Sequence, residues 1–152
     1  MLKITGSLKF DGADRDSEWT PFLGRERRVI GHRLLRRPKD KFVRDSLELL
    51  QLEEANVTEC PLTKELLADE GTEYLGKDDH HLFRQVMGKI IYVYEDYIGC
   101  QFAIQRLTTE LQTPTDTSMK RLKHLVRHVK GLLDMVHVGE VEPSAAIKVF
   151  VD

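Results

Sequence analysis

The sequence predicts an α+β fold, in which a β hairpin segment precedes a bundle of about four helices and a short β stub follows. Apolar residues alternate with polar ones near the N-terminus and recur at spacings of three and four in the middle of the chain. The 152 residues are 41% hydrophobic, enough for a real core in one domain or slightly more. We expect a hairpin segment at 1–37, a helical region at 38–133 with an acidic loop at 53–79, and a β stub at 134–152.

The β segments are predicted from alternation and turn residues. Residues 2–10 alternate apolar and polar side chains, which indicates a strand, and the turn signal of residues 11–14 follows. A second β segment opens at 22–26 and folds back at Gly31 as a hairpin. We expect Trp19, the only tryptophan, to anchor the core or this hairpin. Two further strands are predicted at 135–138 and 146–151.

Helical spacing recurs in four segments. Pro38 suits the first turn of a helix, where its missing N–H costs nothing, and the apolar side of that helix extends to about Leu52. Apolar residues at helical spacing mark three more helices, at 82–91, 100–111 and 119–133. Thr115 or Asp116 can cap the start of the last helix.

Charge is unevenly distributed along the chain although the net charge is only −2. The segment from Arg25 to Arg44 contains nine basic and two acidic residues, a net charge of +7, whereas the segment 45–81 has a net charge of −9. The basic cluster can present a surface to a polyanion, or it can pair with the acidic stretch; both interpretations stay open. Alternation along a hairpin strand places Arg25 and Arg27 together with Arg28 opposite. The hairpin candidates for phosphate contact are Arg25, Arg27, Arg36 and Arg37.

The last helix carries a second basic row. Lys120, Lys123, Arg127 and Lys130 recur at spacings of three, four and three, so they share the side opposite the apolar stripe. Such a row can follow a phosphate backbone and would make binding depend on salt. The alternative is a solvated face that keeps a core helix soluble, and charge alone favours this alternative.

No catalytic or metal site is expected. The segment Tyr94–Tyr97 (YEDY) resembles a polymerase metal motif, but two metal ions about 4 Å apart need adjacent carboxylates on a tight strand turn. Here the neighbouring residues form the end of a helix. The segment Asp78–His81 (DDHH) has no third ligand at helical spacing, so we expect its aspartates to cap the helix and face its positive end.

Cellular location is inferred from absences in the sequence. Cys60 and Cys100 lie far apart and form no zinc-ligand pattern, which fits a reducing compartment and buried, apolar thiols. The N-terminus lacks the apolar core of a signal peptide, and no stretch approaches 18 apolar residues. We expect an intracellular protein, cytoplasmic or nuclear, with no membrane partner.

Three phrases follow one another at a characteristic spacing: FRQVMGKIIYV (83–93), QFAIQRL (101–107) and PTDTSMKRLKHLVRHVKGLLD (114–134). The succession resembles Copia-type LTR retrotransposon Pol polyproteins between the reverse transcriptase thumb and the RNase H domain. The phrases there are roughly "yRslvGsLlYl", "RPDiqyAvsrL" and "Pt…lkrvlRYLkGt". The resemblance covers nearly the whole chain and is clearest from Phe22 to Leu133.

The resemblance implies a fragment of an RNA-directed DNA polymerase: the palm end, the thumb and the connection to RNase H. The basic helix and the hairpin would then contact the primer–template nucleic acid, with the remainder of the Pol polyprotein as the other partner. The catalytic aspartates of the family align upstream of residue 1, so no activity is expected from the chain alone. It needs no cofactor itself, since Mg²⁺ serves the intact polymerase. Asp152 would match the first acidic residue of RNase H, in a truncated site.

Two departures from the family pattern leave alternatives open. The segment 97–100 (YIGC) stands where the family has RPDI, and His128 replaces a tyrosine. Both fit drift in a decaying copy or a divergent lineage. A second hypothesis is a small helical protein-interaction module without a nucleic-acid role. Its binding faces would be Leu82/Val86/Ile90 and Leu122/Val126/Val129.

Overall fold

The computed structural model describes residues 18–22, 24–31 and 33–140, and the chain divides into two compact units. The sheet unit takes residues up to Arg37 and from Val136 onward, and the helical unit spans Pro38–Met135. The fold is therefore α+β, with an N-terminal hairpin, helices and a short C-terminal strand. The helical unit is an insertion between two neighbouring strands of one sheet, because the chain leaves the sheet once and returns once.

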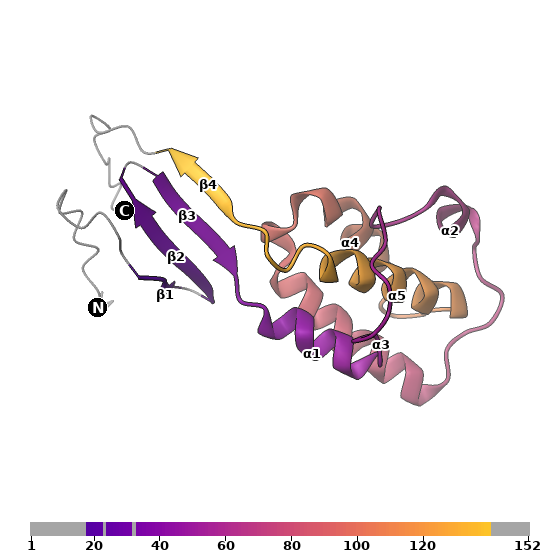
Figure 1. The fold of residues 1–152 in the computed structure, drawn as a ribbon. Coiled ribbons are helices and arrows are strands. Elements are labelled where there is room, and N and C mark those ends of the chain that lie inside the picture. Colours follow the sequence, from indigo (N-terminus) through magenta and orange to yellow (C-terminus); the bar gives the residue numbers. More distant parts are fainter. Residues whose placement is uncertain (1–17, 23, 32, 141–152) are drawn as a thin grey trace, which may run out of the picture. The chain divides into compact units, whose positions relative to one another are not determined.

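The sheet has four described strands in sequential order (Figure 1). They are β1 (Thr20–Phe22), β2 (Arg25–Ile30), β3 (Arg33–Pro38) and β4 (His137–Glu140). The predicted hairpin is confirmed: β2 and β3 are neighbours, joined at Gly31, whose φ of +58° suits a residue without a Cβ. The predicted strands at 2–10 and 146–151, the turn at 11–14 and Asp152 lie outside the described residues.

The C-terminal strand pairs with β3, about one hundred residues earlier in the chain. This antiparallel pairing sets Arg33 opposite Glu140 and Arg36 opposite His137. The described strands of the predicted hairpin segment and of the predicted β stub, β1 to β3 and β4, thus belong to one sheet. No local pattern in either segment indicates this partnership, since strand alternation does not specify its neighbour.

The helical unit contains five α-helices and two 3₁₀ turns in the described residues (Figure 1). The α-helices are α1 (Lys41–Leu49), α2 (Lys64–Ala68), α3 (Lys77–Tyr92), α4 (Gln101–Thr108) and α5 (Asp116–Lys130). The 3₁₀ turns are η1 (Tyr94–Asp96) and η2 (Ile98–Cys100). The four predicted helices correspond to α1, α3, α4 and α5, and the short α2 was missed inside the acidic loop.

Helix starts differ from the predictions in two places. Pro38 ends β3 and α1 begins only at Lys41, because a residue without an N–H fits the end of a strand as well as the start of a helix. Gly76 is the N-cap of α3, so Asp78 and Asp79 lie in its first turn, near the positive end of the helix, and cap nothing.

The start of α5 follows the sequence signal closely. Thr115 is the N-cap, and its Oγ1 accepts a hydrogen bond from the Ser118 backbone N–H at 3.3 Å. In return, Ser118 Oγ accepts a hydrogen bond from the Thr115 N–H at 2.9 Å. This reciprocal capping box leaves two otherwise orphaned backbone donors satisfied, so the helix starts at a defined residue.

The core of the helical unit forms where the amphipathic faces meet. Helix α1 packs against α3 and α5, and α4 packs against α5 and α3. Val86 and Ile90 of α3 and Leu122, Val126 and Val129 of α5 are fully buried. The apolar stripes that the sequence predicted therefore face each other within this chain.

Candidate nucleic-acid interface

The predicted arginines of the hairpin divide between the two faces of the sheet. Arg37 Nε donates to Glu26 Oε2 at 2.7 Å, which places both side chains on one face. The Arg37 guanidinium also stacks over Trp19, with Cζ 4.2 Å from the ring centroid. Arg37 is thus held by a carboxylate and an aromatic ring, and Trp19 serves as a hairpin anchor.

The opposite face gathers the other three hairpin candidates. Since side chains alternate along a strand, Arg25 and Arg27 of β2 lie on the face opposite Glu26. By the same rule, Arg36 of β3 lies on the face opposite Arg37. Arg25, Arg27 and Arg36 therefore share one face of the sheet, which we call the arginine face.

The described residues of the outer strands place Thr20 and His137 on the arginine face. Thr20 of β1 lies opposite Arg27, and His137 of β4 lies opposite Arg36, so both share this face. Glu140 pairs with Arg33 and belongs to the other face together with Glu26. Among the described strand residues, the acidic positions thus all lie on the face away from these three arginines.

The basic row of α5 is only half exposed. The exposed Lys120 donates to Asp116 Oδ2 at 3.0 Å, one turn earlier, and this hydrogen bond lowers the pKa of the Asp116 carboxyl. Lys123 is exposed at the rim of a hollow of about 290 Å³. These two side chains are the ones on α5 that a ligand reaches directly.

The other half of the row holds a loop of the same chain. Arg127 Nε donates to the carbonyl oxygen of Asn56 at 2.6 Å. Lys130 Nζ donates to the carbonyl oxygen of Ala55 at 2.9 Å and also to that of Glu53. Both cations therefore bind the backbone of residues 53–60, a segment that we call the strap.

Two histidines of α5 continue this attachment. His124 Nε2 lies 3.0 Å from the carbonyl oxygen of Cys60, and His128 Nδ1 lies 2.8 Å from that of Thr58. The Thr58 hydroxyl donates back to the His124 carbonyl oxygen at 3.2 Å. Because carbonyl oxygens only accept, the two ring nitrogens that face them must carry protons. The strap is thus bound along the polar side of α5.

Arg121 is a structural residue that the sequence analysis missed. It is 1% exposed, and its guanidinium donates to the Glu110 carboxylate and to the carbonyl oxygens of Leu66 and Asp69. One signal could have identified it: Arg121 lies one turn before Leu125, on the flank of the apolar stripe rather than in the exposed row.

The acidic loop predicted at 53–79 is ordered around these donors. It binds α5 through backbone carbonyls, while many of its carboxylates stay on the surface. The exposed acidic residues of this stretch are Glu53, Glu54, Glu59, Glu65, Asp69, Glu70, Glu73, Asp78 and Asp79. Two ion pairs of the basic cluster are local, Arg37 with Glu26 and Arg44 with Asp40.

The remaining titratable candidates lie in a 3₁₀ turn and in the core of the helical unit. Tyr94–Asp96 forms the 3₁₀ turn η1 after α3, and Asp96 is buried. Burial raises the pKa of the Cys100 thiol to about 11, so it is protonated at neutral pH. Over the described ranges, no group of three or more His, Cys, Asp or Glu side chains could hold a metal ion.

No helix within the described residues is both long and apolar enough to cross a membrane. In comparisons with models of known protein families, with curated proteins and with solved structures, this chain matches none of them.

Proposed function

We propose that the chain is the thumb and connection part of a Copia-type reverse transcriptase, and that its arginine face contacts the phosphates of the primer–template. One observation carries this proposal: Arg25, Arg27 and Arg36 lie together on one face of the sheet, on neighbouring strands. Arginine forks match phosphate oxygens in a bidentate geometry, and strands hold them at fixed spacing.

The arrangement of elements supports the same proposal. The three phrases that resemble the family lie mainly in α3, in α4 and in α5, in the order that the family has. The helical unit joins the sheet through two chain passages, after Arg37 and before Val136. In this proposal the helical unit corresponds to the thumb and the sheet to the end of the palm.

The contacts of α5 restrict its part in such binding. Arg127 and Lys130 bind the strap, so in this proposal the phosphate contacts of α5 fall to Lys120 and Lys123. The role of the chain is to position the duplex, and polymerisation with Mg²⁺ belongs to other parts of the polyprotein. The chain alone extends no primer in this proposal.

Neutralising the arginine face tests the proposal against a matched control. The test variant is Arg25→Gln/Arg27→Gln/Arg36→Gln. The control variant, Arg28→Gln/Arg33→Gln/Arg37→Gln, removes the same charge from the opposite face. Fluorescence anisotropy of a labelled RNA–DNA duplex at several salt concentrations measures binding, and circular dichroism checks the fold.

We expect the test variant to bind more weakly and to lose about two to three units of the slope of log K against log salt. The control variant should lose less than about one unit. Equal losses in the two variants would show that only net charge matters and would refute the arginine face as the contact.

A protein-interaction module is the second candidate, favoured by one exposed surface. Large apolar side chains are exposed along the segment from the end of α3 to the start of α4: Ile91, Tyr92, Tyr94, Ile98 and Phe102. Exposed apolar side chains that form one patch often mark a partner site. The faces Leu82/Val86/Ile90 and Leu122/Val126/Val129, which the sequence suggested for this role, lie largely in the core of this chain.

This surface separates the two candidates. Ile98→Asp with Phe102→Asp should leave duplex binding unchanged if the chain acts as a thumb. Under the second candidate, the same variant loses self-association or partner binding, measured by sedimentation velocity. If the Ile98→Asp/Phe102→Asp variant keeps its fold but loses duplex affinity, the exposed apolar side chains cannot be a surface separate from the duplex contact.

A further inference from the structure

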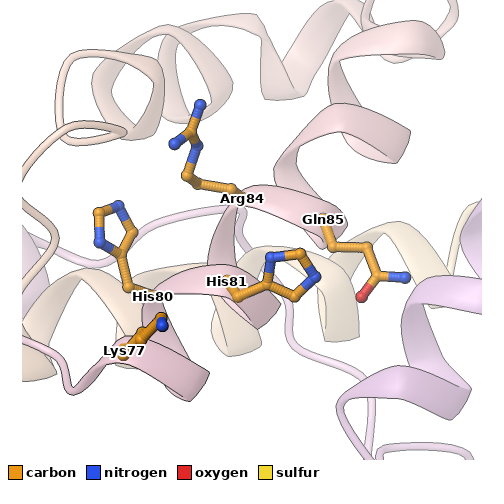
Figure 2. A pocket seen from close by; sticks show the side chains of 5 residues that line it. All are labelled: Lys77, His80, His81, Arg84 and Gln85. Carbon is orange, nitrogen blue, oxygen red and sulfur yellow. The ribbon is translucent and has the colours of Figure 1, made fainter.

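The first two turns of α3 carry a basic stripe. Lys77, His81 and Arg84 are spaced by four and three residues, so they share one side of the helix. Together with His80 and Gln85 they line an open hollow of about 690 Å³ (Figure 2). All three stripe residues are exposed. The stripe therefore offers the charges of Lys77 and Arg84 beside this hollow of the helical unit.

Carboxylates are missing from the described lining of this hollow. Asp79, on the same turn, lines the smaller hollow beside Lys123 instead. In the part of the chain that the structure describes, Lys77 and Arg84 take part in no ion pair. This sets the stripe apart from Arg127 and Lys130, whose donors the strap occupies.

Neighbouring elements leave this positive charge in place. His80 Nε2 lies 3.0 Å from the carbonyl oxygen of Leu111, which fixes the ring between α3 and the end of α4. Glu110, the carboxylate next to Leu111, binds Arg121 and lies 3.2 Å from Arg106. That carboxylate is therefore engaged by two arginines of its own.

We infer that the hollow lined by Lys77, His80, His81 and Arg84 is a binding site for a phosphate group. The Arg84 guanidinium supplies a planar fork for two phosphate oxygens, and Lys77 supplies a point charge. The hollow is open, so it can admit a phosphate group that is part of a larger molecule, such as a di- or triphosphate or a nucleic-acid backbone. The inference goes beyond the proposed function, because this site lies in the helical unit and needs no contact by the arginine face.

Nuclear magnetic resonance on the full chain tests this site with inorganic pyrophosphate as the probe. The ring protons of His80 and His81 and the backbone amides of residues 77–85 report binding. Ionic strength is kept constant with chloride. The test variant is Arg84→Gln, and the matched control is Lys64→Gln, which removes an equal charge from the exposed first position of α2.

The expected result is saturable shifts of both histidine signals in the parent protein. Arg84→Gln should raise the apparent Kd about tenfold, the effect of losing a charge-assisted hydrogen bond. Lys64→Gln should bind as the parent does. The inference is overturned if pyrophosphate gives no saturable shift, or if Arg84→Gln and Lys64→Gln bind it equally well.

A second titration identifies the source of the phosphate. If a short RNA–DNA duplex shifts the same signals and displaces pyrophosphate, the phosphate that binds belongs to a polynucleotide. Shifts with pyrophosphate alone assign the site to a small phosphorylated ligand. The proposed function is tested separately, by the duplex affinity of the arginine-face variants. The phosphate site and the proposed function can therefore be refuted independently of each other.

Discussion

A single buried arginine, Arg121, joins three parts of the helical unit. It extends from α5 to the Glu110 carboxylate after α4 and to two carbonyl oxygens at the end of α2. A charge that is 1% exposed is tolerated only because these acceptors replace water. Arg121 is therefore one of the side chains of α5 that hold the acidic segment around α2, together with Thr117, whose hydroxyl donates to Asp69 Oδ2 at 2.8 Å.

Replacing this arginine should be costly. Arg121→Met leaves the mostly buried Glu110 carboxylate without its main partner, and we expect the free energy of unfolding to fall by about 3 kcal/mol. Urea denaturation measures this difference. Arg106→Met is the matched control, since Arg106 pairs with the same carboxylate from a more exposed position and should cost less than about 1 kcal/mol. Similar losses in both variants would contradict this role of Arg121.

Cys100 gives the stability a dependence on alkaline pH. Burial raises its thiol pKa from 9.0 to about 11, so the unfolded chain loses this proton first as pH rises. The contribution is complete below pH 9 and disappears as pH rises towards 11. We expect a loss of about 2 kcal/mol over this range from this group. Burial also raises the pKa of the Tyr97 phenol, which steepens the loss at still higher pH.

Chemical denaturation at several pH values measures this effect. Cys100→Ala removes the thiol, so its free energy of unfolding should change less between pH 9 and 11 than that of the parent. The variant is less stable at every pH because it leaves a small cavity, and only the slope is diagnostic. Parallel curves for parent and variant would show that the thiol contributes nothing to it.

Among the elements, helix α5 has two structural roles, one on its apolar side and one on its polar side. Its apolar stripe closes the core, and its polar side holds the strap through Arg127, Lys130 and the histidines between and before them. A row of cations at helical spacing thus binds backbone carbonyls of its own chain. The spacing of this row is compatible with a phosphate backbone or with solvent as its surroundings, and it gives no sign of such internal acceptors.

Loosening the strap should affect a defined stretch of backbone. In Arg127→Met/Lys130→Met we expect amide hydrogen exchange within residues 53–60 to become about tenfold faster, because the cations no longer hold the carbonyls. Exchange in the middle of α5 should stay unchanged. The control Lys120→Met/Lys123→Met removes the same charge from the exposed half of the row and should leave the strap protected. Equal exchange in both variants would show that the strap does not depend on these two side chains.

At the scale of the whole molecule, the helical unit contains a core of its own. All eighteen buried apolar residues found in the described chain lie between Val43 and Val129. They come from helices and turns of the unit Pro38–Met135, with none from the sheet. A unit with its own core is expected to fold without the strands on either side.

Expression of residues 38–135 alone tests this independence. We expect the helical circular dichroism of the unit to match its share of the parent spectrum, and thermal unfolding to be a single cooperative transition. The full chain carrying Val126→Asp is the control for a broken core and should lose cooperativity. A gradual, non-cooperative transition of the isolated unit would show that the sheet is needed to stabilise it.

Local periodicity made much of this fold predictable. Alternation identified the hairpin about Gly31, and spacings of three and four identified α1, α3, α4 and α5, because each pattern reflects the geometry of one element. Alternation also placed Arg25 and Arg27 together. That Arg36 lies on the same face as Arg25 and Arg27 follows only from the ion pair between Arg37 and Glu26, which places those two side chains on the opposite face. The sequence does not show this, because the pairing register depends on two strands.

The hairpin, the helices α1, α3, α4 and α5, their order and the clustering of charge along the chain could all be predicted from the sequence, whereas the short α2 could not. The tertiary structure alone decided what each charged group contacts: β4 returns to β3, Arg121 is buried, and the strap occupies Arg127 and Lys130. Element type follows from interactions over a few residues, which a sequence displays directly. Partners separated by fifty to one hundred residues depend on packing of the folded chain, and backbone carbonyls, the acceptors used here, look the same at every position of a sequence.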